Sequence, residues 1–178
     1  MQVREKSGQT LTELITEAEF KTYIGLLTND QDDVIYDIIA ASRVWFEENT
    51  GRSVISKVYE VEFEKADGYE NWYELPYSPV TAIASVEIGG TAVGYSEKGL
   101  NVVSIYPESV ISTGTTNNSL AVEFTAGGAD SRAKLALMRI CADYYDARKD
   151  NPNAEISSAS LKWDTMKLVN QLSNNVSI

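Results

Sequence analysis

EENTGRSVISKVYEVEFE, residues 47–64, is the stretch in which the pattern of the chain changes most abruptly. Upstream of it, apolar residues recur every three or four positions, as they do along one face of a helix. Within it the period becomes two, and apolar residues alternate with glutamates as in a half-buried strand. Gly51 suits the left-handed residue that closes a helix. The stretch therefore predicts a long helix that ends at Thr50 and Gly51 and is followed at once by a strand.

Two helices are predicted upstream of this joint and one far downstream. The first is expected over about residues 16–27, where Thr16 and Glu19 have the spacing of a capping box. The second is expected over about residues 30–50, because it opens with several acids and the positive end of a helix dipole favours negative charge. Helical period returns over about residues 131–149. We expect this last helix to pack on the first two.

The middle of the chain, about residues 53–126, has the pattern of a small antiparallel β region. Short runs of strand-forming residues, among them VTAIASVEI at residues 80–88, are separated by turn signals such as Gly89-Gly90. A sheet made of hairpins with helices grouped beside it is an α+β arrangement. We therefore expect one α+β domain over residues 12–150, with a helical pair, the β region and a closing helix in that order.

Residues 151–178 are expected to form a C-terminal arm that is extended or helical. An Asn-Pro-Asn sequence stops the preceding helix, and a serine-rich hinge follows it. Beyond the hinge, apolar residues can form one stripe that has no obvious place in the core. Trp163 is the first candidate anchor, because large aromatic side chains dominate interface energies. The candidate contact residues of the arm are Leu161, Trp163, Met166, Val169 and Leu172.

The composition indicates a globular protein without a membrane span. The chain has 178 residues, of which 43% are hydrophobic, and it contains no apolar run of the length of a span. Its first residues lack the layout of a secretory signal. A single cysteine excludes an internal disulfide and fits a reducing cytoplasm. We therefore expect assembly inside a cell.

The charge of the chain is strongly negative and unevenly distributed. The formal net charge is -11. Residues 1–128 carry 20 acids and 8 bases, whereas residues 129–178 carry 6 acids and 7 bases. Tight wrapping of nucleic acid needs clustered Lys and Arg, so specific DNA binding is not expected. An acidic surface can still face DNA that must slide without sticking.

Catalytic and metal sites are disfavoured by the residue types present. The chain has no histidine and one cysteine. This removes the usual general base, the Ser-His and Cys-His dyads, and the usual ligand sets of zinc. The chain has enough serines and lysines for a catalytic Ser-Lys pair, but no sequence feature distinguishes one such pair from the others. We therefore expect a protein that is not an enzyme and has no cofactor or metal.

Two motifs leave a structural and a functional interpretation open. Arg52, in the Thr-Gly-Arg-Ser turn, could belong to a phosphate loop. The turn follows the negative end of a helix dipole, however, which favours a helix cap or a pairing with an acid of a neighbouring subunit. The pair Trp72-Tyr73 could stack on a sugar or a base, but aromatic residues in short strands more often belong to a core or an interface.

The row of Glu60, Glu62 and Glu64 is also open to two interpretations. Like charges at alternate positions of one strand repel each other when they are crowded. The row is therefore either a solvated face or a surface that is kept negative, such as the lining of a channel.

Several motifs occur in the order and spacing of one known family. They are TEAEFKTYIGL, DDVIYDIIAASRVWFEENTGRSVI, ELPYSPVTAIASVEI, VEFTAGG and AKLALMRICADYYDARKD. Over about residues 12–150 the chain resembles the head-tail connector proteins of long-tailed bacteriophages, which are also called head-completion or portal adaptor proteins. The chain departs from the family pattern after Asn151, and Phe124 stands where a tyrosine is more usual.

The resemblance implies a structural virion protein that forms a ring, expected to be dodecameric, under the portal. Such a ring completes the head after DNA packaging and provides the platform for tail attachment. Its implied partners are the portal protein, neighbouring copies of itself, stopper or tail proteins, and passing genomic DNA that is not bound specifically; no membrane is implied. It would be assembled in the host cytoplasm and would end in the neck of the virion.

Site residues follow from this expectation together with the residue patterns. The apolar residues of the arm and Arg52 are candidates for contacts with the portal or within the ring, and the row from Glu60 to Glu64 is a candidate for the acidic face of a DNA channel. Deletion of residues 155–178 is expected to abolish portal docking while the domain stays folded. The alternatives are another neck component, such as a stopper or tail-completion protein, and a ligand-binding β module.

Overall fold

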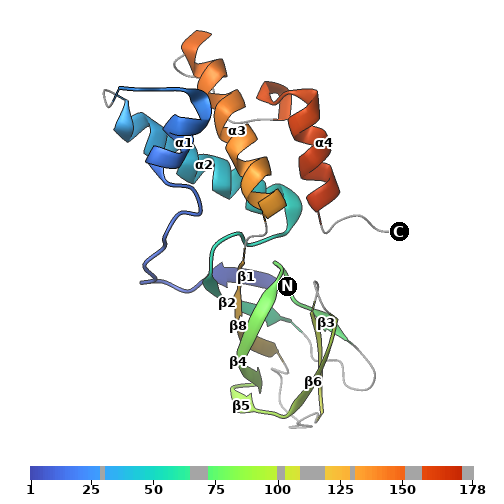
Figure 1. Cartoon of the computed structure of the whole chain (residues 1–178). Coiled ribbons are helices and arrows are strands. Elements are labelled where there is room, and N and C mark those ends of the chain that lie inside the picture. Colours follow the sequence, from blue (N-terminus) through green and yellow to red (C-terminus); the bar gives the residue numbers. More distant parts are fainter. Residues whose placement is uncertain are drawn as a thin grey trace. The chain divides into compact units, whose positions relative to one another are not determined.

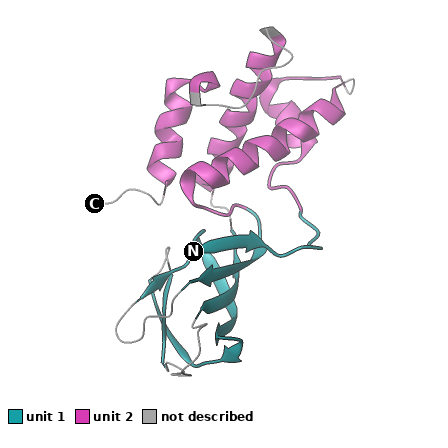
Figure 2. Cartoon of the chain, turned by 180° about the vertical axis from the view of Figure 1, so that it is seen from behind, with its two compact units in different colours: residues 1–11, 55–128 teal, residues 12–54, 129–178 magenta. Residues whose placement is uncertain are grey.

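The chain forms two compact units, one of strands and one of helices (Figure 2). The computed structural model describes residues 1–28, 31–64, 72–99, 103–108, 119–128, 131–150 and 158–173, without the side chains of Asp150 and Ser158. The β unit comprises residues 1–11 and 55–128, and the helical unit comprises residues 12–54 and 129–178. The α+β class predicted from the sequence is confirmed.

The β unit contains two antiparallel sheets (Figure 1). The larger sheet has the strand order β1-β2-β8-β4-β5, and the smaller has the order β3-β7-β6. The last strand of the unit, β8, thus lies between β2 and β4 in the larger sheet. The strands are β1 (Gln2–Glu5), β2 (Lys57–Phe63), β3 (Tyr73–Glu74), β4 (Val80–Ile88), β5 (Thr91–Ala92), β6 (Tyr95–Lys98), β7 (Ser104–Pro107) and β8 (Leu120–Ala126).

One apolar cluster fills the β unit. Along β8, every second residue is buried and the residues between are partly exposed, which is the alternation that a strand with one core-facing side requires. Both sheets contribute to the cluster, so it binds them together. Its buried members are Tyr59, Val61, Leu75, Val86, Ile88, Val103, Ile105, Leu120, Val122, Phe124 and Ala126.

Gly127 gives a physical reason for the Ala-Gly-Gly sequence at the end of β8. Its φ is +139°, and a Cβ at this position would lie 2.1 Å from the carbonyl oxygen of Ile55. Its N–H donates a hydrogen bond to the carbonyl of Pro79 at 2.9 Å. A side chain here would therefore collide with backbone atoms, which cannot rotate away.

The helical unit packs helices from both ends of the chain (Figure 1). The predicted capping box is present, since the Thr16 side chain and the Glu19 side chain each bond to the other's backbone N–H. Gly51 is left-handed, with φ 67°, and ends the long helix as predicted. α3 packs on α1 and α2, and α4 packs on α2 and α3. The α-helices are α1 (Glu17–Ile24), α2 (Asp32–Thr50), α3 (Ser131–Asp150) and α4 (Trp163–Leu172).

Two predicted helix boundaries are corrected by the structure. The first helix does not reach residue 27, because Gly25 takes the left-handed conformation and ends α1, which leaves Leu27 97% exposed. The second begins at Asp32, with Gln31 as its N-cap residue, rather than near residue 30. Among the residues that the structure describes, no helix combines the length and the apolar character that crossing a membrane requires.

The strands differ from the sequence prediction mainly at the N-terminus. β1 pairs with β2 and extends the larger sheet, although the domain was expected to begin at residue 12. Its four residues are too few to show a reliable period. The strand expected to begin at Ser53 begins at Lys57.

Candidate functional site

The outward face of the larger sheet is hollowed into a groove of about 350 Å³. The register places Glu60 between Arg4 of β1 and Glu123 of β8. Ala121 lies between Glu62 on one side and Glu87 on the other. We call this surface the acidic groove and define it by Arg4, Glu60, Glu62, Glu87, Ala121 and Glu123.

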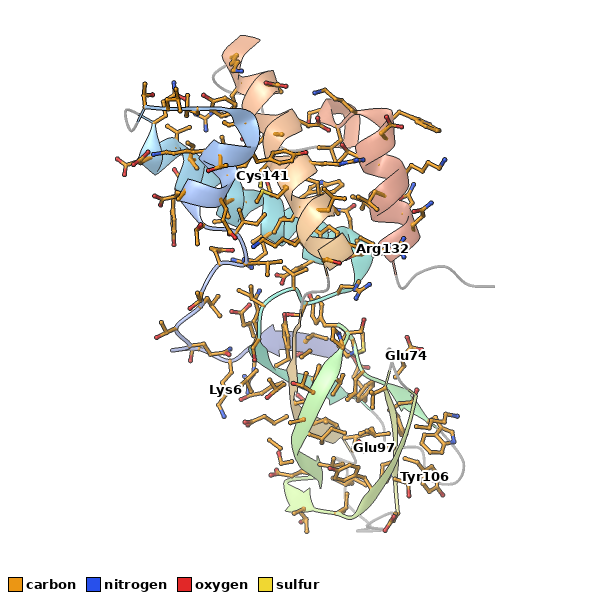
Figure 3. All side chains as sticks on the ribbon, viewed as in Figure 1. Lys6, Glu74, Glu97, Tyr106, Arg132 and Cys141 are labelled. Atoms are coloured by element: carbon orange, nitrogen blue, oxygen red, sulfur yellow. The ribbon has the colours of Figure 1, made fainter. Side chains whose placement is uncertain are left out.

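Two bases near the N-terminus offset part of this acidity. The Arg4 Nε donates to the Glu60 carboxylate at 2.5 Å. The ammonium of Lys6, which is labelled in Figure 3, lies 2.9 Å from the Glu123 carboxylate. The hydrogen bond with Glu123 raises the pKa of Lys6. Within the described part of the chain, Glu62 and Glu87 have no ion-pair partner. The groove therefore keeps an excess of negative charge at Glu62 and Glu87.

The three glutamates of the predicted row have different surroundings in the structure. Glu60 is half-buried and paired with Arg4, and Glu62 is exposed in the acidic groove. Glu64 is exposed and follows the end of β2. The sequence prediction missed the two bases that lie beside these glutamates. They are brought there by the pairing of β1 with β2, in which Arg4 and Glu60 are 56 positions apart in the sequence.

The apolar residues predicted to be arm contacts have two different surroundings. Leu161, Val169 and Leu172 are buried within the helical unit. Met166 is half-buried, whereas Trp163 is 73% exposed. Three of the five candidates thus pack within their own chain, and only Trp163 and Met166 remain candidates for contacts with another molecule.

Trp163 and Met166 lie on a surface that also carries two cations. The Lys167 ammonium lies 5.0 Å from the centre of the Trp163 ring. Arg132, at the start of α3, donates to the Gln171 side chain of α4 at 3.4 Å (Figure 3). We call this surface the α4 patch and define it by Arg132, Trp163, Met166, Lys167, Asn170 and Gln171.

Asp143, a buried acid of α3, fastens the start of α4. Its Oδ2 accepts the backbone N–H of Lys162 at 3.0 Å and the hydroxyl of Thr165 at 2.7 Å. The Lys162 ammonium lies 3.2 Å from the other Asp143 oxygen and 3.3 Å from Asp146. The hydrogen bond with Asp143 raises the pKa of Lys162. Hydrogen bonds with Lys149, which has the larger effect, and with Lys162 lower the pKa of Asp146. The α4 patch is thus presented by a helix with a defined attachment.

The joint at Gly51 is a structural feature with its own buried charges. Glu47 is 4% exposed, accepts the backbone N–H of Val54 at 2.9 Å, and lies 3.0 Å from the Arg43 guanidinium. Burial lowers the pKa of Arg43, but Glu13 and Glu47 outweigh it and raise the pKa overall. Arg52 is half-buried, and its backbone N–H donates to the Thr50 hydroxyl at 3.3 Å. A helix C-terminus beside a buried carboxylate repels a phosphate rather than binding it.

The aromatic pair of the β unit does not form one platform. Tyr73 packs into the core with its ring 5.0 Å from that of Phe63. Trp72 is 40% exposed and lies 5.6 Å from Tyr106 on the smaller sheet. The Lys98 ammonium lies 4.1 Å from the centre of the Trp72 ring. The ring therefore already has a cation on one face, and its neighbour Tyr73 offers no second stacking surface.

Neither the one cysteine nor the acids of the described residues indicate a nucleophilic or metal-binding site. Burial raises the pKa of Cys141 to about 12, so its thiolate, which is the nucleophilic form, is scarce at neutral pH. The described parts of the chain contain no group of three or more acids and cysteines arranged to hold a metal ion.

Solved structures with a similar fold come from a gene transfer agent particle. A chain in "Virion of native gene transfer agent (GTA) particle" matches with TM-score 0.71 and 16% identity, covering 100% of this chain and 98% of that one. A chain in "Neck of native GTA particle computed with C12 symmetry" matches with TM-score 0.64 and 16% identity, covering 96% and 98%. At these identities the likeness establishes the fold. No curated protein matches the chain.

The comparison with protein families is more specific. The family described as "Head completion protein" matches residues 13–167, which include α1, α2, both sheets apart from β1, α3 and the first half of α4. This confirms the resemblance inferred from the sequence motifs, including the role as a structural connector between head and tail. The chain belongs to the head completion protein family.

Proposed function

We propose that copies of this chain assemble into a ring, expected to be dodecameric, under the portal of a bacteriophage head. The ring completes the head after DNA packaging and provides the platform for tail attachment. The observation that carries this proposal is the likeness in fold, over nearly the whole of both chains, to a chain in a neck computed with twelvefold symmetry. Family membership supports it independently.

The role is carried by contacts rather than by catalysis. In a ring, one flank of each subunit meets the other flank of its neighbour, so two different surfaces of each chain are used. The α4 patch and the acidic groove are candidates for these surfaces. The net charge of -11 lets genomic DNA pass without specific binding. The proposed partners are therefore the portal, neighbouring copies, and stopper or tail proteins, in the neck of a virion assembled in the host cytoplasm.

Particles made without this chain test the proposal. We expect DNA-filled heads that carry no tails, and we expect added purified chain to restore tail attachment. Added chain with Trp163→Ala, which removes the exposed ring of the α4 patch, should restore tail attachment less well than added chain with the matched control Tyr36→Ala, which removes a 53% exposed aromatic residue outside the patch. Tailed, infectious particles formed in the absence of the chain would contradict the proposal.

The position of the chain in the particle separates a connector from another neck component. We expect electron microscopy of tagged particles to place it in contact with the portal. A position nearer the tail, with another protein between the chain and the portal, would indicate a stopper or tail-completion protein instead.

A further inference from the structure

We propose that the α4 patch of one copy docks into the acidic groove of the next copy in the ring. This inference rests on the proposed ring and adds which surfaces meet in it. It assigns a partner of stated chemistry to each surface: a second copy of the same chain that supplies the opposite charge.

The acidic groove has the shape and charge of a receptor for a cation beside an aromatic ring. Its volume of about 350 Å³ is at the small end of the range found for ligand pockets, which suits one large side chain. Glu62 and Glu87 flank Ala121, a small residue that leaves the floor of the groove open. Since neither glutamate has an ion-pair partner among the described residues, an incoming cation would gain two carboxylates.

The α4 patch supplies the complementary groups. Trp163 is the most exposed aromatic residue among the large hydrophobic residues of the described chain, and Lys167 lies over its ring. Arg132 adds a second positive charge to the patch. No acid is among the described residues that line it. Trp and Arg are the residue types that most often dominate binding energy at interfaces.

Charge also explains why these two surfaces, rather than two identical ones, would meet. Copies with a net charge of -11 repel each other. The region that contains the α4 patch, residues 129–178, has 7 bases against 6 acids, whereas residues 1–128 have 20 acids against 8 bases. Contact between the least acidic region of one copy and an acidic surface of the next reduces this repulsion. Such a contact is heterologous, which is the kind that closes into a ring.

The groove is less suited to line a DNA channel than the sequence alone indicated. Arg4 and Lys6 are each paired with a glutamate of the same face, so the charge that would repel DNA is reduced to that of Glu62 and Glu87. A neighbouring copy that brings Trp163 and Lys167 would cover this mixed surface instead.

A charge exchange tests the contact directly. Glu62→Lys and Lys167→Glu each place like charges in the proposed contact, and both positions are exposed, so the fold should be kept. We expect each single variant to raise about tenfold the chain concentration needed to form rings on the purified portal, counted by electron microscopy. The chain with both substitutions should regain ring formation. Failure of the double variant to recover, or singles that match the unsubstituted chain, would overturn the proposal.

A cross-link separates failure of this contact from failure of the ring itself. Chains with Ala121→Cys are mixed with chains that carry Asn170→Cys, added to the portal and oxidised; Cys141 stays unreactive because it is buried. We expect covalent dimers from this mixture and none when Leu27→Cys, at an exposed site outside the patch, replaces Asn170→Cys. Rings without the cross-link would overturn the contact while the proposed function stands. An unsubstituted chain that forms no ring on the portal would overturn the proposed function.

Two further outcomes would reassign the surfaces. Loss of portal docking in Lys167→Glu that Glu62→Lys does not restore would make the α4 patch a portal contact. Intact rings from Glu62→Lys chains that release packaged DNA or retain it abnormally would make the groove a channel lining. Either result would overturn the proposed contact between copies.

Discussion

The β unit and the helical unit are stabilised in different ways. The β unit encloses an apolar cluster to which both sheets contribute, and most of its charged residues lie on the outer faces of the strands, although Lys57, paired with Glu5, is only 5% exposed. The helical unit buries charge: Arg43, Glu47 and Asp143 are each at most 6% exposed. Each of these buried groups joins parts of the chain that are separate in sequence, either at the joint after α2 or at the start of α4.

This difference has a consequence for function. An apolar core tolerates changes at the outer strand faces, so surfaces such as the acidic groove can vary without loss of the fold. Buried ion pairs are costly to desolvate and strongly destabilising when one partner is removed, but they fix geometry. The angle at which α4 leaves Lys162, and hence the direction of the α4 patch, depends on such groups.

The largest effect is expected from a cavity in the β unit. Phe124 is fully buried at the centre of β8, with its ring 5.6 Å from that of Tyr59. We expect Phe124→Ala to lower the free energy of unfolding by about 3–5 kcal/mol. Glu62→Ala, on the outer face of the same sheet, should change it by less than about 0.5 kcal/mol. Urea unfolding measures both; similar losses would mean that the apolar cluster is not the main support of this unit.

A somewhat smaller effect is expected from a buried charge of the helical unit. Glu47→Ala removes a carboxylate that pairs with Arg43 and accepts the Val54 N–H, and we expect a loss of about 3 kcal/mol. Glu48→Ala, at the exposed neighbouring position, is the matched control and should cost less than about 0.5 kcal/mol. If the two variants unfold at the same urea concentration, burial of charge does not distinguish the units.

A local effect is expected at the start of α4. Asp143→Asn weakens the bonds to Lys162 and Thr165, and we expect about 1–3 kcal/mol less protection of the α4 amides against hydrogen exchange. The amides of β8 should be unaffected. Asp146→Asn, whose carboxylate is 54% exposed, should change protection little. Equal loss throughout the chain would mean that α4 has no separate attachment.

The smallest effect on stability is expected from the titration of Asp146 and Lys162 at the start of α4. The folded pKa of Asp146 is lowered, so its stabilisation is present above the ordinary range of aspartate and is lost as pH falls through the folded value. The folded pKa of Lys162 is raised, so its stabilisation is present at lower pH and is lost as pH rises beyond the ordinary lysine range. We expect the urea midpoint to be flat between about pH 5 and pH 9. In Lys162→Met the alkaline decrease should become smaller; an unchanged alkaline limb would exclude this pair as its source.

Local signals in the sequence predicted much of the fold. The capping box at Thr16 and the left-handed Gly51 depend on neighbouring residues, and both are present in the structure. The strand Val80–Ile88 was predicted with the bounds that the structure has, because its flanking proline and glycines mark both ends.

The rest depends on contacts between distant residues. Pairing of β1 with β2, and the position of β8 between β2 and β4, cannot be read from a periodicity. The packing of α4 depends on Asp143, which is 22 residues from its partner Thr165. For the same reason, the sequence identified Trp163 as a contact residue but not the cations beside it, and identified the glutamate row but not the bases of the N-terminal strand.

The most direct test of the account is a mass measurement of the purified chain with and without its portal. We expect a monomer or small species alone, because net repulsion opposes association, and a complex of one portal with a closed ring of this chain when both are present. A chain whose mass is the same with the portal as without it would contradict the account.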